Sequence, residues 1–460
     1  MRTIIALAAI AVVSSTAPVA RTAPVAPVAP VAPVAPELDW PSWRGPTGTG
    51  VTAEKGLPAQ WGEASGIAWR VKLSGTGVST PIVAGPHLFV TSQMGSGARR
   101  TGNHPSLVQG ADAATTGERN LGGTAARSPA DGVTFAVTAY RWTDGARVWQ
   151  HDTRAAGPLP AVHDKHNLST ASPVTDGQTV IAWFGTGQVV AHDAVTGKLI
   201  WTRHLGKEYG PFEINWGHAS SAALHGDLAI FPCYHESGSY LLALDKRTGA
   251  VRWKRDRQPS AHSYSTPLIV TYGGLDTLVL NSSRGVEAFN PATGEPRWQV
   301  LEENRFPIPM PVHHQGVLYM SRGYRSSPYL AIRLGGTGDV STSHVLWKTP
   351  TGAPYVSSLV HYDGLLYMAG EMGIVTAVDP ATGQSVWRER VGGVFTASPV
   401  AGDGKVYLVS ETGETVVLRA GRKPDIVSRN KLNAHVVASP AIARGRIFLR
   451  GDDELIAIGK

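Results

Sequence analysis

Short apolar stretches, each about one strand long, recur along most of this chain and are separated by turn-forming residues. Residues 189–191 and 199–201 are two such stretches, and Asp193, Thr196 and Gly197 stand between them. Asp opens a turn by bonding the backbone amides that follow it, and Gly supplies the positive φ that closes the turn. The spacing therefore predicts two strands joined in a β-hairpin.

This hairpin belongs to a longer repeat, Ala-x-Asp/Asn-x-x-Thr-Gly-x-x-x-Trp. Strict copies occupy residues 191–201, 243–253, 288–298 and 377–387, a looser copy ends at Trp149, and a stretched copy ends at Trp347. Because Trp is large and flat, it can pack between neighbouring sheets. We predict this docking role for Trp69, Trp149, Trp201, Trp253, Trp298, Trp347 and Trp387.

A second pattern marks the start of each repeating unit: Ser/Thr-Pro, a short apolar run, a turn and a stronger strand. Clear copies begin at Thr80, Ser172, Thr266, Ser398 and Ser439, and weaker copies begin at Ser220, Met310 and Ser357. Most starts lie 41 to 48 residues apart, the spacing of one four-stranded propeller blade. The first gap is 92 residues, which predicts an insertion at about residues 95–132 in the first blade.

The two ends of the repeat region complement each other. After Ser439 the sequence offers only two strong strands, near residues 447–449 and 455–458, whereas a spare strand stands at residues 67–73. We predict an all-β fold: an eight-bladed β-propeller of four-stranded antiparallel blades, with the ring closed by the N-terminal strand. Closure removes sheet edges that invite aggregation. A solenoid with free ends is the structural alternative.

The first residues have the pattern of a secretory signal. Arg2 precedes an apolar run, Ile4–Val13, and small residues follow it, so we assign residues 1–20 to a signal peptide. Ten apolar residues are too few to span a bilayer, which favours cleavage over an uncleaved anchor. Residues 21–38 repeat Ala, Pro and Val and predict a semi-rigid linker, and residues 39–460 hold the propeller. We expect a periplasmic or secreted protein with no membrane span after cleavage.

The composition limits the classes of partner and anchor that we expect for this chain. Gly is abundant, with 52 residues, charged residues make up 17%, and the net charge of +7 is spread along the chain. This fits many short strands and argues against nucleic-acid binding. Cys233 is the single cysteine, so no internal disulfide forms, and we expect a buried, inert thiol. No cysteine follows the signal, so we expect no lipid anchor of the bacterial lipoprotein type.

With these repeats the chain resembles the quinoprotein-like propeller superfamily over about residues 40–460. Within that superfamily it is most similar to bacterial propeller repeat proteins that are described as pyrroloquinoline-quinone (PQQ)-binding-like. The segments that carry this resemblance are residues 40–46, 165–167, 215–218 and 241–245. The resemblance implies a fold and a location outside the cytoplasm. It implies no reaction, because the same blades serve dehydrogenases and non-catalytic scaffolds.

Dehydrogenases of that superfamily hold PQQ with a vicinal cysteine pair, a Trp platform, a calcium ion with acidic and amide ligands, and an Asp base. This chain has no cysteine pair and no Cys-x-x-Cys-His haem motif. No motif matches the calcium ligands or the base, so we expect no cofactor and name no catalytic residue. PQQ with calcium is the alternative. The outer-membrane barrel-assembly scaffold is similar in blade number and in lacking this site, but it is normally lipid-anchored.

Loops that precede the innermost strands of a propeller gather at one mouth of its channel. Aromatic faces there suit a sugar ring or a flat quinone, and imidazoles suit a metal or an anion. Our candidate ligand-binding residues are His166, Asn167, Asn215, Trp216, His218, Tyr264, Tyr355 and His435. The structural alternative for His166 and His218 is a hydrogen bond to nearby backbone. No short-range pair such as His-x-x-x-His occurs, so we predict no metal site.

We therefore expect an exported, non-catalytic binding or scaffold propeller that acts as a monomer. Its partner is expected to be a protein or a small polar or carbohydrate ligand. The alternative is a PQQ-dependent alcohol or sugar dehydrogenase with a non-standard site. Carbohydrate cleavage is a third hypothesis, but no paired-carboxylate motif supports it. The basic insertion suits an acidic partner or a polysaccharide, or it is a solvated loop.

Overall fold

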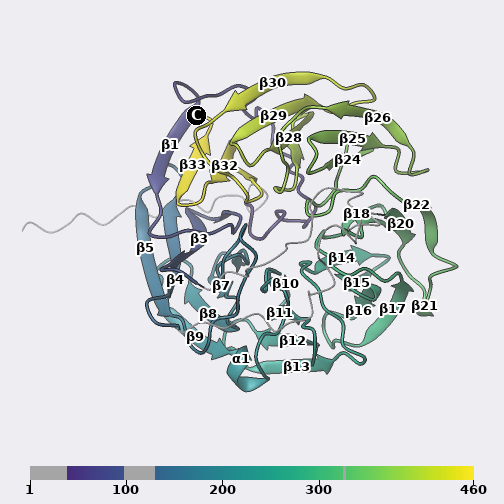
Figure 1. The fold of residues 1–460 in the computed structure, drawn as a ribbon. Helices are drawn as coiled ribbons and strands as arrows, with labels where there is room; N and C mark the ends of the chain where they lie inside the picture. The colour runs from purple at the N-terminus through teal and green to yellow at the C-terminus, as the bar shows by residue number, and fades with distance from the viewer. Residues whose placement is uncertain (1–38, 98–129, 325–327) are drawn as a thin grey trace, which may run out of the picture. The chain divides into compact units, whose positions relative to one another are not determined.

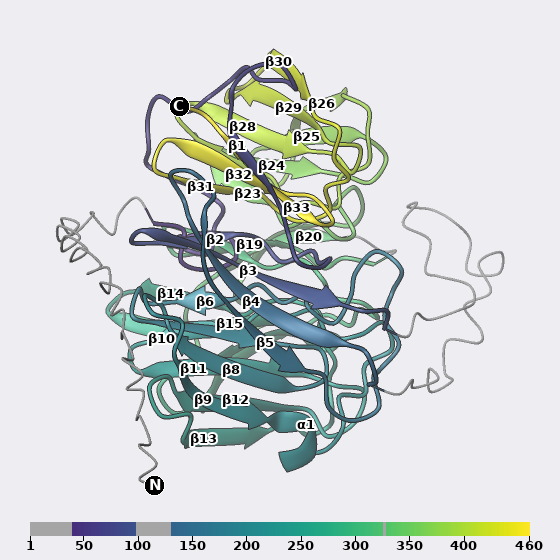
Figure 2. The same ribbon diagram turned by 90° about the vertical axis from the view of Figure 1, so that its left-hand side faces the viewer.

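The computed structural model describes residues 39–97, 130–324 and 328–460, which form a ring of eight antiparallel sheets (Figure 1). The innermost strand of each blade comes first in sequence for seven blades, and the innermost strands of neighbouring blades contact one another. Figure 2 shows the strand order β2-β3-β4-β5 of the first blade from outside the ring. The predicted eight-bladed propeller is confirmed.

The strand bounds follow the repeat. The first four blades comprise β2 (Ile82–Ala84), β3 (His87–Met94), β4 (Thr134–Arg141), β5 (Arg147–Arg154); β6 (Val174–Thr175), β7 (Thr179–Trp183), β8 (Gln188–Asp193), β9 (Leu199–His204); β10 (Ala223–His225), β11 (Leu228–Cys233), β12 (Tyr240–Asp245), β13 (Val251–Asp256); and β14 (Leu268–Tyr272), β15 (Leu275–Ser282), β16 (Gly285–Phe289), β17 (Pro296–Leu301). A one-turn helix, α1 (Leu205–Glu208), follows the second blade. Among the described residues no helix is long and apolar enough to cross a membrane.

The remaining blades complete the ring. They comprise β18 (Val312–His314), β19 (Val317–Ser321), β20 (Tyr329–Arg333), β22 (Val345–Thr349); β23 (Val360–Tyr362), β24 (Leu365–Ala369), β25 (Ile374–Val378), β26 (Ser385–Arg390); β27 (Val400–Gly402), β28 (Lys405–Val409), β29 (Glu414–Arg419), β30 (Ile426–Lys431); and β31 (Ala441–Ala443), β32 (Arg446–Arg450), β33 (Glu454–Ile458), β1 (Ile67–Lys72). In the eighth blade β1 pairs with β33, so the N-terminal strand closes the ring as predicted.

Two predicted parts of the chain lie wholly or mostly outside the described residues. The predicted signal peptide and linker, residues 1–38, lie outside the described residues, as does most of the predicted insertion. That insertion separates the second and third strands of the first blade, because β3 ends at Met94 and β4 begins at Thr134. One detail was not predicted: β21 (Gly338–Asp339) adds a fifth, parallel strand to the outer edge of the fourth blade.

In seven of the eight blades a Trp stands at the position expected from the repeat, and the seventh blade has Ser428 there. In the second blade the indole N–H of Trp201 donates to the carbonyl of Lys246 at 3.0 Å, in the hairpin turn of the third blade. Gly249 in that turn lies against the indole, where a Cβ would come within 2.7 Å of the ring. Because its φ is also 71°, this position requires glycine. Trp69, Trp149, Trp347 and Trp387 make the corresponding indole bond to the following blade.

Trp253 and Trp298 depart from that pattern in different ways. Trp253 packs on Gly294 of the fourth blade, but its indole N–H has no hydrogen-bond partner among the described residues. Trp298 faces a blade whose corresponding turn is stretched, and its neighbour across the strand edge is Gly338 of β21. β21 therefore lies beside Trp298. Most of the other docking Trp residues instead pack on a tight hairpin turn of the following blade.

The Ser/Thr-Pro marks form a chain of hydrogen bonds around the channel. The backbone N–H of Ser172 donates to the hydroxyl of Ser221 in the next blade at 2.9 Å. We call this chain the hydroxyl girdle; its other bonds are Thr80 to Ser172, Ser221 to Thr266, Met310 to Ser358, Ser358 to Ser398 and Ser398 to Ser439. Since these N–H groups are buried, the hydroxyls satisfy donors that would otherwise be left without partners.

The segment before β1 crosses one end of the channel (Figure 1). Trp40 pairs with Val83 of the first blade, and Val51 pairs with Ala401 of the seventh. Between them, the buried guanidinium of Arg44 donates to the carbonyls of Leu359 and Pro399, at 2.5 and 2.8 Å. This segment lies beside the innermost strands themselves, so the loops that precede those strands surround the opposite end.

Two histidines are packed into the wall between the second and third blades. The rings of His218 and His235 both contact Phe212, with ring centroids 5.4 and 4.3 Å apart respectively. Burial lowers the pKa of each imidazole to about 3, because a charged ring would lose its hydration. Cys233 is also buried, and burial raises the pKa of its thiol. These side chains are therefore neutral parts of the core.

Replacing one girdle hydroxyl should destabilise the ring. In Ser358→Ala the buried N–H of Met310 loses its acceptor, so the free energy of unfolding should fall by about 1–3 kcal/mol. Denaturant unfolding of the purified protein measures this change. Ser65→Ala, at an exposed serine, is the control and should change the same quantity by less than about 0.5 kcal/mol. Equal effects of both substitutions would contradict the role of the girdle.

The buried histidines predict loss of stability in acid. Their folded pKa values of about 3 lie below the ordinary value of 6.5, so below pH 6.5 the unfolded chain takes up protons that the folded chain does not. The free energy of unfolding should therefore fall from about pH 6.5 to 4, by up to about 1.4 kcal/mol per pH unit for each histidine. Denaturant unfolding across this range measures the slope.

His235→Gln removes one of these titrating groups and should make the slope shallower. His435→Gln is the control, because its side chain is 52% exposed, and it should leave the slope almost unchanged. An identical slope in wild type and His235→Gln would show that His235 is not kept neutral by burial.

Candidate functional site

A cavity of about 200 Å³ occupies the centre of the ring, among the loops that precede the innermost strands. Its deep part is formed by girdle residues, including Ser172, Ser221 and Ser439. Trp43, from the segment that crosses the opposite end of the channel, also lines it. The channel is therefore a blind pocket with an aromatic floor.

Aromatic side chains make one wall of this pocket. Trp216, Tyr264, Phe306 and Tyr355 belong to one cluster and come from loops of successive blades. Each is less than a tenth exposed, and all four line the cavity. Tyr264 and Phe306 have ring centroids 6.3 Å apart at an angle of 60°, an edge-to-face arrangement. Such a wall suits a ligand with an apolar or flat face.

Charged groups stand on the opposite side of the mouth. The ammonium of Lys165 lies 2.6 Å from the carboxylate of Glu411, which belongs to the loop that follows β28. The same carboxylate oxygen accepts a hydrogen bond from the hydroxyl of Thr396. Lys165 and Thr396 both line the cavity. The pair therefore places a cation and an anion next to an apolar space, where a polar edge of a ligand would find partners.

A buried carboxylate holds the loop that carries Tyr355. One oxygen of Glu371 accepts the backbone N–H groups of Tyr355 and Val356, at 2.9 and 2.8 Å. Burial raises the pKa of Glu371 to about 7, although these two hydrogen bonds favour the charged form. Glu371 thus positions the aromatic wall from behind.

The structure brings four of the predicted site residues to the cavity: His166, Trp216, Tyr264 and Tyr355. His166 also has the structural role considered from the sequence. Its Nε2–H donates to the carbonyl of Trp216 at 2.8 Å, and its Nδ1 lies 3.1 Å from the hydroxyl of Thr170. His166 therefore fixes the loop that presents Trp216.

The other four predicted residues do not line the cavity. Asn167 bonds Thr76 and the N–H of Ser169, which braces its own loop. The N–H of Asn215 lies 3.4 Å from a carboxylate oxygen of Glu236. His218 is in the core, with its ring centroid 3.9 Å from that of Trp183. His435 is exposed and pairs with Asp452.

Sequence reasoning did not select Trp43, Lys165 or Phe306 as site residues. Trp43 and Lys165 stand in segments that carry the family resemblance, which was a signal for both. No local pattern marks Phe306, whose place depends on packing against Tyr264 and Tyr324.

The described residues do not fit PQQ held by calcium. The channel cavity is lined by no Asp, Glu, Asn or Gln side chain of the described residues, whereas calcium takes oxygen ligands of these kinds. Cys233 lies in β11 within the core and does not line the cavity. The cavity supplies aromatic rings and one ion pair, which suit binding by contact and hydrogen bonding.

Comparisons with known proteins agree with this fold. BamB from Moraxella catarrhalis superposes with a TM-score of 0.55 at 15% identity, over 86% of this chain and 97% of that chain. A quinohemoprotein alcohol dehydrogenase from Comamonas testosteroni superposes with a TM-score of 0.59 at 14% identity, over 93% and 81%. At these identities the likeness concerns the fold alone.

A curated relative and a family profile match the sequence itself. Tetrathionate hydrolase from Acidithiobacillus ferrooxidans is 28% identical over 229 residues, which are 46% of this chain and only 43% of that protein. The profile described as outer membrane protein assembly factor BamB matches residues 49–210, 133–369 and 371–459. This chain belongs to the family of the outer membrane protein assembly factor BamB, within the PQQ-like eight-bladed propellers.

Proposed function

We propose that this protein is an exported, non-catalytic binding propeller whose blind channel takes a small ring-shaped ligand with one apolar face and a polar edge. The observation that carries the proposal is the cavity itself. Aromatic side chains line one wall, Trp43 lines the floor, and the Lys165–Glu411 pair stands at the mouth. A sugar ring has this division into an apolar face and hydroxyl edges, which makes saccharides the first class to test.

The family supports a role in binding. Its description as an assembly factor is a protein-interaction role for the family's namesake, and a scaffold of this kind needs no reaction. We therefore also expect that this chain binds a protein partner through its surface. The secretory pattern of residues 1–20 supports action outside the cytoplasm.

Ligand binding should depend on Trp216. A thermal-shift screen with monosaccharides, disaccharides and heteroaromatic acids identifies a ligand, and calorimetric titration then measures its affinity. Trp216→Ala removes a ring of the cavity wall, so affinity should fall about tenfold or more. Tyr272→Ala is the matched control, because this aromatic side chain is 50% exposed and does not line the cavity.

Turnover is followed in the same samples. Tetrathionate is included as a substrate because the curated relative is a tetrathionate hydrolase. The proposal expects one-to-one binding without consumption of any compound. Steady tetrathionate loss, or unchanged affinity in Trp216→Ala, would overturn it.

A further inference from the structure

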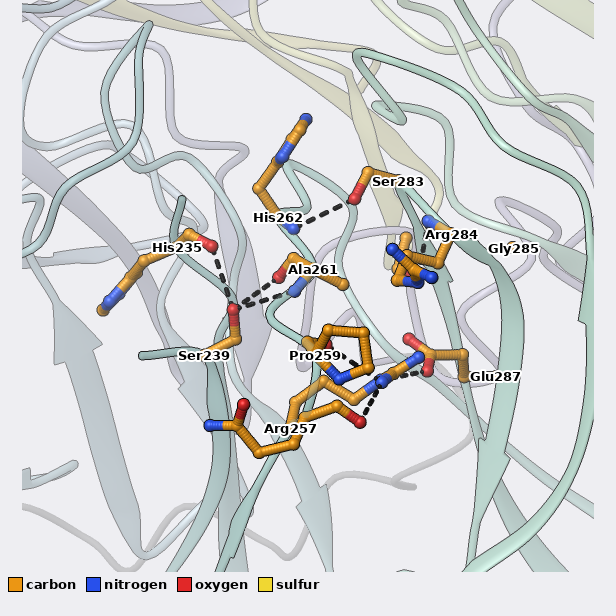
Figure 3. A network of polar contacts seen from close by, with 12 residues as sticks. His235, Ser239, Arg257, Pro259, Ala261, His262, Ser283, Arg284, Gly285 and Glu287 are labelled. Carbon is orange, nitrogen blue, oxygen red and sulfur yellow. Dashed lines mark hydrogen bonds and ion pairs between the residues drawn. The ribbon is translucent and has the colours of Figure 1, made fainter. Parts of the chain in front are cut away.

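A second cavity, of about 440 Å³, lies between the third and fourth blades, away from the channel. Its walls include Tyr234, Arg255, Arg257, Gln258, Glu287 and Trp298. Figure 3 shows the side chain of Arg257 reaching the carboxylate of Glu287 across the space between the blades. We call this cavity the interblade crevice.

Glu287 occupies a position that is uncharged in every other blade. It precedes Ala288, which pairs with the docking Trp298 in the outermost strand. The residues that precede the corresponding pairing position in the other seven blades are Thr138, Val190, Leu242, Leu330, Thr376, Val416 and Ile456. A carboxylate that is 5% exposed therefore replaces an aliphatic or threonine side chain here.

Arg257 departs from the repeat in the same way. Its backbone N–H donates to the carbonyl of Ser239, the residue just before the third strand of its blade. Five other blades make this bond with a buried apolar residue: Leu73, Ala155, Leu205, Val391 and Leu432. The two members of the ion pair thus stand together at positions where most other blades have apolar side chains, although the fourth blade has Glu302 at the position of Arg257.

Burying this ion pair costs free energy, because both charged groups lose hydration. Nε of Arg257 lies 2.5 Å from Glu287, and its guanidinium also donates to the carbonyls of Gln258 and Pro259. Replacing a buried ion pair by apolar residues is often neutral or stabilising, so stability alone does not explain its presence.

Polar atoms around the crevice lack partners within the protein. The second carboxylate oxygen of Glu287 and Nε of Arg255 are buried with no hydrogen bond among the described residues. The hydroxyl of Tyr234 is buried beside this pair, and burial, together with the charge of Glu287, raises its pKa well above the ordinary value. One acceptor and one donor in the residues that line the crevice are therefore left without a protein partner.

We propose that the interblade crevice is a second binding site, for a neutral saccharide. The walls carry charges of both signs, from Arg255, Arg257, Arg297, Asp256 and Glu287. A hydroxyl group both donates and accepts, so a neutral polyhydroxyl compound can satisfy this mixed set. The crevice lies within the size range of small-ligand sites and accommodates a short oligosaccharide. This site is independent of the channel.

The test separates binding from folding by restoring the repeat. The double variant Arg257→Leu/Glu287→Leu copies the corresponding residues Leu205 and Leu242 of the second and third blades. It should unfold at the same temperature as wild type or higher. Titration with neutral trisaccharides (maltotriose, cellotriose, laminaritriose and mannotriose) should show binding of at least one by wild type, and about tenfold or greater loss in the variant.

Trp216→Ala distinguishes the two sites. It removes the channel wall and should leave trisaccharide binding at the crevice unchanged, whether or not the channel has a ligand. Gln258→Ala changes an exposed residue at the crevice and should weaken binding even if the double variant fails to fold. No binding of any trisaccharide by wild type would overturn the proposal. Binding that survives both crevice variants, or that only Trp216→Ala abolishes, would overturn it as well.

Discussion

The structure depends on hydroxyl groups that accept hydrogen bonds from the buried backbone of a neighbouring blade, which the described residues do at six of the eight blade junctions. A hydroxyl at the start of one blade accepts the N–H at the start of the preceding blade, and this repeats around the channel. On the outer side, an indole bonds a turn of the following blade. These two contacts, one near each edge of the sheet, connect neighbouring blades around the ring. The centre is thereby left open as a cavity.

Much of the fold was predictable because these contacts use few residue types. Ser/Thr-Pro and Thr-Gly-x-x-x-Trp carry the girdle and the docking, so their spacing gave the number of blades and the closing strand. The fifth strand β21 was not predictable, because it pairs two residues of a stretched turn with a distant strand. No local pattern specifies such a pairing.

The site was predictable only in part, for a geometric reason. Sequence order tells which loop a residue occupies, but not which way its side chain points. Trp216 and His218 are two residues apart, yet Trp216 lines the cavity and His218 is buried in the core. Lys165, in the loop before the second blade, meets Glu411 in a loop of the seventh blade although 246 residues separate them in sequence. The sequence shows that the charged residue Glu287 directly precedes a repeat, but only the structure shows that its side chain is buried.

We propose that the channel binds a ring compound and catalyses no reaction. Calorimetric titration of the purified protein with PQQ, with and without calcium, together with dye reduction on alcohols and sugars, tests this claim most directly. We expect that calcium has no effect on any uptake of PQQ and that no dye is reduced. Tight one-to-one binding that requires calcium, accompanied by dye reduction, would contradict it and would make the protein a dehydrogenase.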